Sequence, residues 1–89
     1  MKLIVAIIKD RDALNVSDAL VEREFRVTRI ASTGGFLRHG NVTLLVGVEA
    51  EAIDEVFGII EGNCTQPERE GEHKATIFVL PAEDFVQIG

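Results

Sequence analysis

Apolar residues follow two different periodicities along the chain, and their alternation predicts six structural elements. Four segments are short and rich in β-branched or other apolar residues, which is typical of strands. Two segments repeat apolar residues at helical spacing, as Ile53, Val56, Phe57 and Ile60 do. The predicted strands are Leu3–Ile8, Phe25–Ala31, Val42–Val48 and Ala75–Leu80, and the predicted helices are Arg11–Arg23 and Ala50–Glu61.

Polar and turn-forming residues mark the ends of these elements. Asp10 or Asp12 can cap the first helix, and Gly62-Asn63 is typical of a helix end. Within the second strand the alternation slips between Val27 and Ile30, which indicates either a bulge or a strand with two apolar faces. Two segments are predicted as loops, Ser32–Asn41 with its three glycines and Cys64–Lys74, and the tail Ala82–Gly89 as a short terminal strand.

The order of these elements, βαββαβ, predicts an α+β fold of the ferredoxin-like class. In this fold a four-stranded antiparallel sheet carries both helices on one face. With 89 residues, the chain is predicted to form a single domain, 1–89. Two helices cover only one face of the sheet, yet Leu3–Ile8 and Ile77–Leu80 are apolar on both sides. We therefore expect a homo-oligomer of cyclic symmetry in which the sheets pack on one another.

Charge is distributed unevenly along a chain whose formal net charge is −6. This balance argues against a nucleic-acid polymer or an anionic membrane as partner. However, the segment Phe25–Val48, called the acid-free window below, contains no Asp or Glu. It carries three arginines and one histidine: Arg26, Arg29, Arg38 and His39. No apolar run is long enough for a membrane span, no signal peptide is expected, and the single cysteine Cys64 fits a reducing cytoplasm.

The glycine-rich segment and its neighbours are candidates for an anionic, partly aromatic ligand. Arg26 and Thr28 lie two positions apart, so in a regular strand their side chains leave the same face and can bind a phosphate. Phe36 and Leu37 are apolar residues in a loop and can hold an adenine-like ring, while Asn41 can read a base edge. These features favour a nucleotide site; alternatively, Gly34-Gly35 only forms a turn and Phe36 packs on a neighbouring subunit.

Other chemistry receives little support from the sequence. His39, His73 and Cys64 lack the spacing of metal ligands, so no metal site is predicted. There is no Ser-His-Asp arrangement and no paired carboxylate, so no catalytic residue is predicted. Cys64 is interpreted as a packing residue at a helix end.

The segment Ser32–Thr43, with the run S-T-G-G-F-L-R-x-G-N, and the preceding Arg26–Arg29 resemble the PII-like cyclic di-AMP receptor family. The opening strand and the segment Ala75–Pro81 are similar to that family as well. The resemblance implies a PII-type, non-enzymatic signal receptor. It implies a homotrimer that binds cyclic di-AMP in the clefts between its subunits, uses no cofactor, and engages a downstream protein partner. The ligand-binding residues that it implies are Arg26, Thr28, Gly35, Phe36, Leu37, Asn41, Gly47 and, in the tail, Gln87.

The chain departs from the family pattern in the connection Cys64–Lys74. This connection has eleven residues and is acidic, whereas familiar members carry a long, glycine-rich loop there. Two alternatives therefore stay open. The first is a PII-like protein-interaction module that binds a partner through Phe36 and Leu37, with another nucleotide or none. The second is a small enzyme acting on a phosphate ester, with Arg26 and Asn41 as oxyanion donors.

Overall fold

A computed structural model of the chain describes residues 1–31, 40–67, 71–83, 86 and 88. The element order confirms the predicted βαββαβ pattern and the ferredoxin-like class. A single 3₁₀ turn, η1, precedes the second helix. The elements are β1 (Lys2–Lys9), α1 (Asp10–Glu22), β2 (Val27–Ala31), β3 (Asn41–Val48), η1 (Ala50–Ala52), α2 (Ile53–Asn63) and β4 (Ala75–Pro81).

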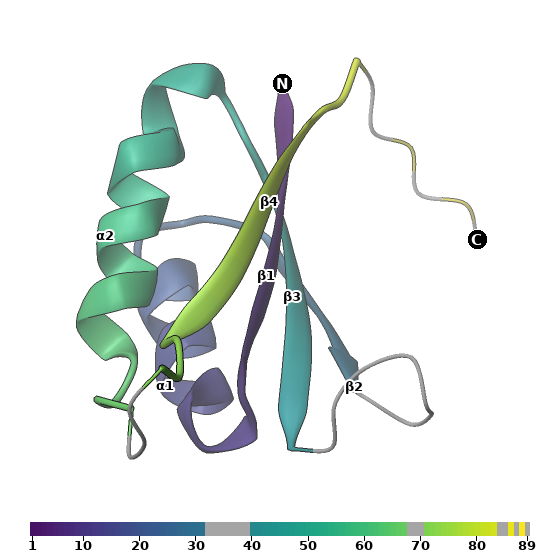
Figure 1. The fold of residues 1–89 in the computed structure, drawn as a ribbon. Coiled ribbons are helices and arrows are strands. Elements are labelled where there is room, and N and C mark those ends of the chain that lie inside the picture. The colour runs from purple at the N-terminus through teal and green to yellow at the C-terminus, as the bar shows by residue number, and fades with distance from the viewer. Residues whose placement is uncertain (32–39, 68–70, 84–85, 87, 89) are drawn as a thin grey trace.

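The four strands form one antiparallel sheet in the order β2-β3-β1-β4. Strand β1 pairs with β3 from Lys2 opposite Val48 to Lys9 opposite Asn41, and with β4 along its other edge. Figure 1 shows α1 and α2 on the same side of this sheet. The sheet face without helices, called the open face below, is the face that the sequence predicts to be uncovered.

The core lies between the sheet and the two helices. Ile4, Ala6 and Ile8 alternate along β1 and are fully buried, because every second residue of a strand points to the same face. Leu3 and Val5, which point to the open face, are only half-buried. Within one subunit, the apolar residues of β1 are therefore fully buried only on its helical face. The buried apolar residues are Ile4, Ala6, Ile8, Ala13, Val16, Leu20, Val42, Leu44, Val46, Val48, Val56, Ile60 and Cys64.

The predicted cap of α1 is wrong. Lys9 is the N-cap residue and makes no side-chain capping bond, whereas Asp10 and Asp12 both lie inside the first turn. Their negative charges still lie favourably near the positive end of the helix dipole. Asp12 is 1% exposed and turns toward α2, where Thr65 Oγ1 donates a hydrogen bond to Asp12 Oδ2 at 3.2 Å.

Two other boundaries differ from prediction for local reasons. Helix α2 continues through Gly62 to Asn63, because the Asn63 side-chain amide donates to the Ile59 carbonyl oxygen at 2.8 Å and completes the last turn. Strand β2 pairs with β3 residue by residue from Val27 to Ala31, so it contains no bulge. The slipped alternation instead reflects a strand with apolar residues on both faces. The described residues of the tail, Ala82, Glu83, Val86 and Ile88, form no strand.

Candidate functional site

The open face carries a pocket at the end of the sheet where β1 begins and β3 ends. Residues directly opposite each other in an antiparallel pair share one face. Leu3 faces Gly47 in this way, and Leu45 faces Thr28. The pocket has a volume of about 370 Å³, within the range typical of small-molecule sites. Its lining, here called the upper pocket, comprises Met1, Leu3, Glu24, Phe25, Arg26, Thr28, Leu45 and Gly47.

Arg26 and Thr28 lie in this pocket together, as their spacing predicts. Thr28 belongs to β2, and Arg26 precedes the first paired residue of that strand. Both side chains are exposed, and no ion pair or side-chain hydrogen bond joins Arg26 to another described residue. The guanidinium is therefore available to an anionic ligand, and it presents a planar fork of donors that suits phosphate oxygens.

Gly47 forms an open part of the same pocket. A Cβ atom built at Gly47 would meet only Met1 Sδ, at 3.9 Å, which is an ordinary contact. The residue is therefore not required by backbone conformation or by crowding. Its missing side chain instead leaves space above the sheet, beside the apolar side chains of Leu3 and Leu45. The upper pocket thus combines a guanidinium that has no ion pair with another described residue, a hydroxyl and an apolar surface, which suits a phosphate-bearing ligand with an aromatic part.

Asn41 is not brought to the upper pocket. It lies at the opposite end of the sheet, opposite Lys9, in a second pocket of about 520 Å³. Four of the predicted ligand residues, Gly35, Phe36, Leu37 and Gln87, lie outside the described residues. The second pocket, here called the lower pocket, is lined by Ile7, Ile8, Lys9, Asn41, Gly71, Glu72, His73, Lys74, Ala75 and Thr76.

Thr43 places a buried hydroxyl on the open face between the two pockets. It pairs with Ile7 on one side and Ile30 on the other, so its side chain shares their face. The residue is 7% exposed, and its Oγ1 atom has no hydrogen-bond partner among the described residues. The sequence motifs do not single out this hydroxyl, although the two-residue repeat of side chains along β3 places it on this face.

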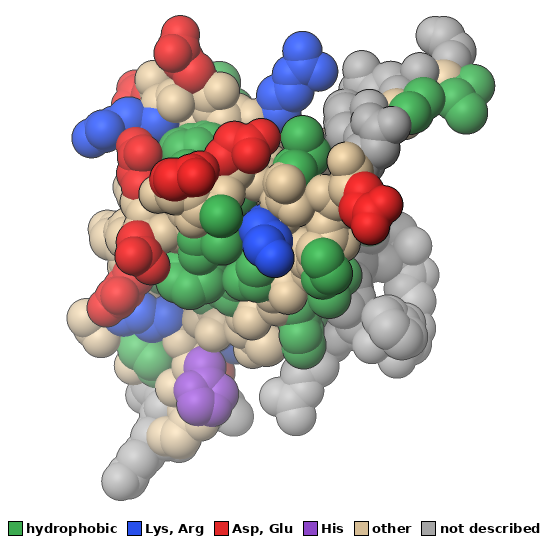
Figure 2. All heavy atoms as spheres, turned by 90° about the horizontal axis from the view of Figure 1, so that it is seen from above, with side chains coloured by type: hydrophobic (Ala, Val, Ile, Leu, Met, Phe, Trp, Pro, Cys, Tyr) green, Lys and Arg blue, Asp and Glu red, His purple; other side chains and the backbone are tan. Residues whose placement is uncertain are grey.

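Both signs of charge lie on the helical side of the molecule, where Arg23 pairs with Glu55 at 3.4 Å. Figure 2 looks down on the fold and shows most of the visible acidic side chains on the helical side. Of the cations in Phe25–Val48, Arg29 forms an exposed ion pair with Asp10 at 3.4 Å, Arg26 has no ion pair with another described residue, and Arg38 lies outside the described residues. The acid-free window therefore contributes Arg26 to the upper pocket.

A family model described as a cyclic-di-AMP receptor matches residues 1–71. The chain belongs to the cyclic-di-AMP receptor family. A solved structure of a functionally unknown protein from Pediococcus pentosaceus is similar to this member of the family, with 35% sequence identity and a TM-score of 0.79. The match covers 98% of this chain and 96% of that one. The resemblance inferred from the residues around the glycine-rich run is thereby confirmed.

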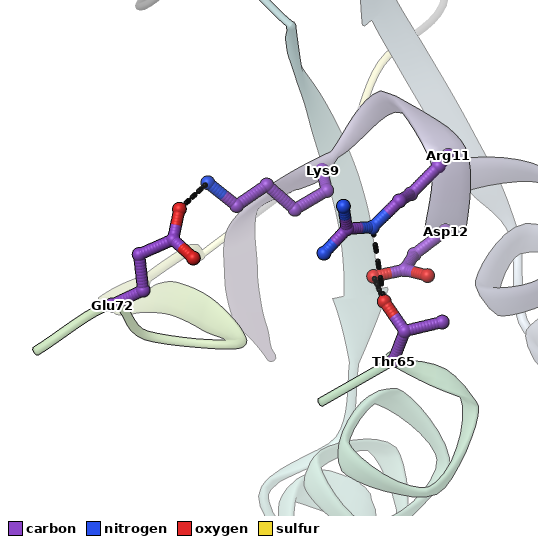
Figure 3. A network of polar contacts seen from close by, with 5 residues as sticks. All are labelled: Lys9, Arg11, Asp12, Thr65 and Glu72. Atoms are coloured by element: carbon purple, nitrogen blue, oxygen red, sulfur yellow. Dashed lines mark hydrogen bonds and ion pairs between the residues drawn. The ribbon is translucent and has the colours of Figure 1, made fainter. Parts of the chain in front are cut away.

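In this cyclic-di-AMP receptor family member, side-chain contacts join the short α2–β4 connection to the residues where β1 ends and α1 begins. Figure 3 shows Lys9 Nζ paired with Glu72 Oε1 at 3.3 Å, and Thr65 Oγ1 accepting a hydrogen bond from Arg11 Nε at 3.1 Å while it donates to Asp12. No local sequence pattern predicts these contacts. The one available signal was Asp12, which precedes Ala13 and lies one helical turn before Val16, on the apolar side of α1.

Cys64 packs against the core at the end of α2, as predicted, and its thiol is free. Desolvation by burial, aided by the nearby Asp12 carboxylate, raises the pKa of the Cys64 thiol above its ordinary value. A thiol of this kind is a poor nucleophile and a poor metal ligand at neutral pH. None of the helices in the described ranges is long and apolar enough to cross a membrane.

Proposed function

We propose that this protein is a non-enzymatic, PII-like signal receptor of the cytoplasm, which binds cyclic di-AMP in the clefts between the subunits of a homotrimer. The single observation that carries the proposal is the upper pocket of a cyclic-di-AMP receptor family member. There Thr28 and Arg26, whose guanidinium has no ion pair with another described residue, lie beside the open space at Gly47. Arg26 binds a phosphate oxygen of the ligand, and Thr28 hydrogen-bonds to phosphate or ribose. An adenine ring lies against Leu3 and Leu45.

The intersubunit position of the ligand is supported by the open face. Phe78 and Leu80 of β4 are 52% and 47% exposed on this face, next to half-buried Leu3 and Val5. An apolar sheet face of this extent favours association. Asn41 and Arg26 lie at opposite ends of one subunit's sheet. Contact between two copies brings the lower pocket of one subunit near the upper pocket of the next, so that both residues serve one ligand.

Two measurements on the purified chain test the proposal. Sedimentation equilibrium at low micromolar concentration is expected to give the mass of a trimer, and a stable monomer would exclude the intersubunit site. Calorimetric titration with cyclic di-AMP is expected to give saturable binding with one ligand per cleft, whereas linear di-adenylate and ATP serve as specificity controls. No heat of binding at high micromolar ligand would remove the ligand assignment while leaving the fold intact.

A further inference from the structure

The lower pocket gathers a second set of cationic and polar side chains, separate from Arg26. Lys9 and Lys74 reach it from the end of β1 and the start of β4, and His73 lies beside them. Asn41 and Thr76 add an amide and a hydroxyl. The lining also includes Glu72, so two lysines, one histidine and one carboxylate share the cavity. Like charges that share a cavity repel one another unless an anion lies between them.

Glu72 supplies the anion that one of these ammonium groups binds in the structure. Its Oε1 lies 3.3 Å from Lys9 Nζ, and each side chain is 32% exposed. Figure 3 shows the carboxylate approaching Lys9 from the side of the α2–β4 connection. A carboxylate and a phosphate both offer oxygen acceptors to an ammonium group. Glu72 therefore marks a position that a phosphate oxygen can take. Lys74 has no ion pair with another described residue.

We propose that the lower pocket binds the phosphate group of a small phosphorylated ligand, with Lys9 and Lys74 as its charged contacts and Glu72 as an internal competitor. The volume of about 520 Å³ exceeds the needs of a bare phosphate and admits an attached sugar-sized group. Asn41 and Thr76 offer that group hydrogen bonds. Binding exchanges the partly exposed Lys9–Glu72 pair, which contributes little to stability, for a more highly charged phosphate.

The phosphate can come from two sources. One is a phosphodiester of cyclic di-AMP presented by a neighbouring subunit, an assignment that rests on the proposed function above. The other is the phosphomonoester of a separate metabolite. Ribose 5-phosphate is the probe for the second source, with ribose as its uncharged control, and cyclic di-AMP is the probe for the first. At least one phosphorylated probe is expected to shift the amide resonances of Lys9, Asn41 and Thr76 in a two-dimensional NMR titration.

Calorimetry on three lysine variants tests the contacts. Lys9→Met and Lys74→Met keep most of each apolar stem. Each variant is expected to bind the phosphorylated probe about tenfold more weakly, which corresponds to one charge-assisted hydrogen bond. Lys2→Met is the matched control, because Lys2 does not line this pocket, and its affinity is expected to equal that of the wild type. Unchanged affinity for both probes in the Lys9→Met, Lys74→Met double variant would overturn the proposal.

The Glu72→Gln variant is expected to change the affinity for the phosphorylated probe in the opposite direction to the lysine variants. Removal of the competing carboxylate frees Lys9, so the phosphorylated probe is expected to bind several-fold more tightly; a weaker or equal affinity would contradict the competitor role. Arg26→Ala separates the two assignments. If Arg26→Ala abolishes cyclic di-AMP binding but leaves ribose 5-phosphate binding intact, the lower pocket acts on its own. If the wild type binds only ribose 5-phosphate, the proposed function fails and the lower pocket stands.

Discussion

The backbone N–H of Phe25 donates a 3.1 Å hydrogen bond to the carbonyl oxygen of Leu20, and this bond ends helix α1. The Glu24 N–H donates to the Val21 carbonyl oxygen at 2.9 Å, which completes a Schellman motif. Glu24 adopts the left-handed conformation that this motif requires, with φ at 68°. The motif directs the chain out of α1 so that Glu24, Phe25 and Arg26 all line the upper pocket.

Replacement of Glu24 by glycine is expected to stabilise the fold. The left-handed conformation costs a residue with a Cβ atom about 1 kcal/mol relative to glycine. Urea denaturation should therefore show Glu24→Gly more stable by roughly that amount. Glu24→Ala is the matched control, because it removes the charge and keeps the Cβ atom. Equal gains in both variants would assign the effect to charge instead.

The charge of Arg26 is expected to carry much of the binding energy for cyclic di-AMP. Arg26→Ala should weaken binding by about 1.5–3 kcal/mol, the contribution of a hydrogen bond to a charged group. Arg23→Ala is the control, because Arg23 pairs with Glu55 at 3.4 Å outside the pocket and is largely exposed. Calorimetry at low and high salt adds a second readout, because screening should weaken the wild type more than Arg26→Ala. Identical affinities in all three proteins would make Arg26 a structural residue.

A side chain at Gly47 is expected to fill the upper pocket without disturbing the fold. Only Met1 Sδ lies within 4 Å of the Cβ position, and valine is favoured in strands. Gly47→Val should therefore keep the wild-type denaturation midpoint and bind cyclic di-AMP at least about tenfold more weakly, as expected for one blocked hydrogen bond or apolar contact. Gly58→Ala is the control, since its Cβ meets nothing within 4 Å and lies on α2. Normal ligand affinity in Gly47→Val would place the ligand elsewhere.

Substitution of apolar residues on the open face by aspartate is expected to separate the subunits. In a Phe78→Asp, Leu80→Asp double variant, each subunit would have to bury two carboxylates against apolar side chains of its neighbour, which is costly. Sedimentation velocity should show the wild type as a trimer and the variant as a monomer. Val21→Asp is the control, because Val21 is 57% exposed on α1, away from the open face. A variant that still forms trimers would show that this part of the sheet is not the interface.

Alkaline pH is expected to destabilise the fold through Cys64. Burial raises the folded-state pKa of its thiol above the ordinary value of 9.0, so the folded state holds this proton more tightly than the unfolded state does. The resulting contribution is complete below pH 9 and is lost as the pH rises through the folded-state pKa. Chemical denaturation from pH 8 upward should show this loss in the wild type. Cys64→Ala, though less stable at every pH, should lack that component, and parallel curves would contradict the assignment.

Much of the fold follows from short-range pattern. Alternation in β1 and the helical spacing of Val56 and Ile60 located the core, and the element order specified the layers. The N-cap of α1 could not be predicted. Aspartate is a common N-cap residue, but Asp12 instead accepts a hydrogen bond from Thr65, which is 53 positions away in the sequence. Propensity describes local competition between conformations, whereas that hydrogen bond depends on how the two helices pack.

The candidate site shows the same division. Arg26 and Thr28 share a pocket because a spacing of two residues places side chains on one face. Asn41 was grouped with them because its amide can read a base edge and because of the family resemblance, but the register of β1 with β3 places it at the far end of the sheet. The lower pocket was not predicted, since it depends on Glu72 and Lys74 approaching Lys9 from a connection whose path no local pattern specifies.

The hydroxyl of Thr43, which has no hydrogen-bond partner among the described residues, has a consequence for the energetics of assembly. A buried hydroxyl without a partner costs about 1–3 kcal/mol, and a single subunit bears this cost whenever it is folded. A neighbouring subunit or a ligand that supplies an acceptor to Thr43 removes the cost. Folding and assembly are then thermodynamically linked, and the melting temperature should rise with protein concentration and with added ligand. The isolated subunit is thus less stable than a subunit whose open face is covered by a neighbour or a ligand.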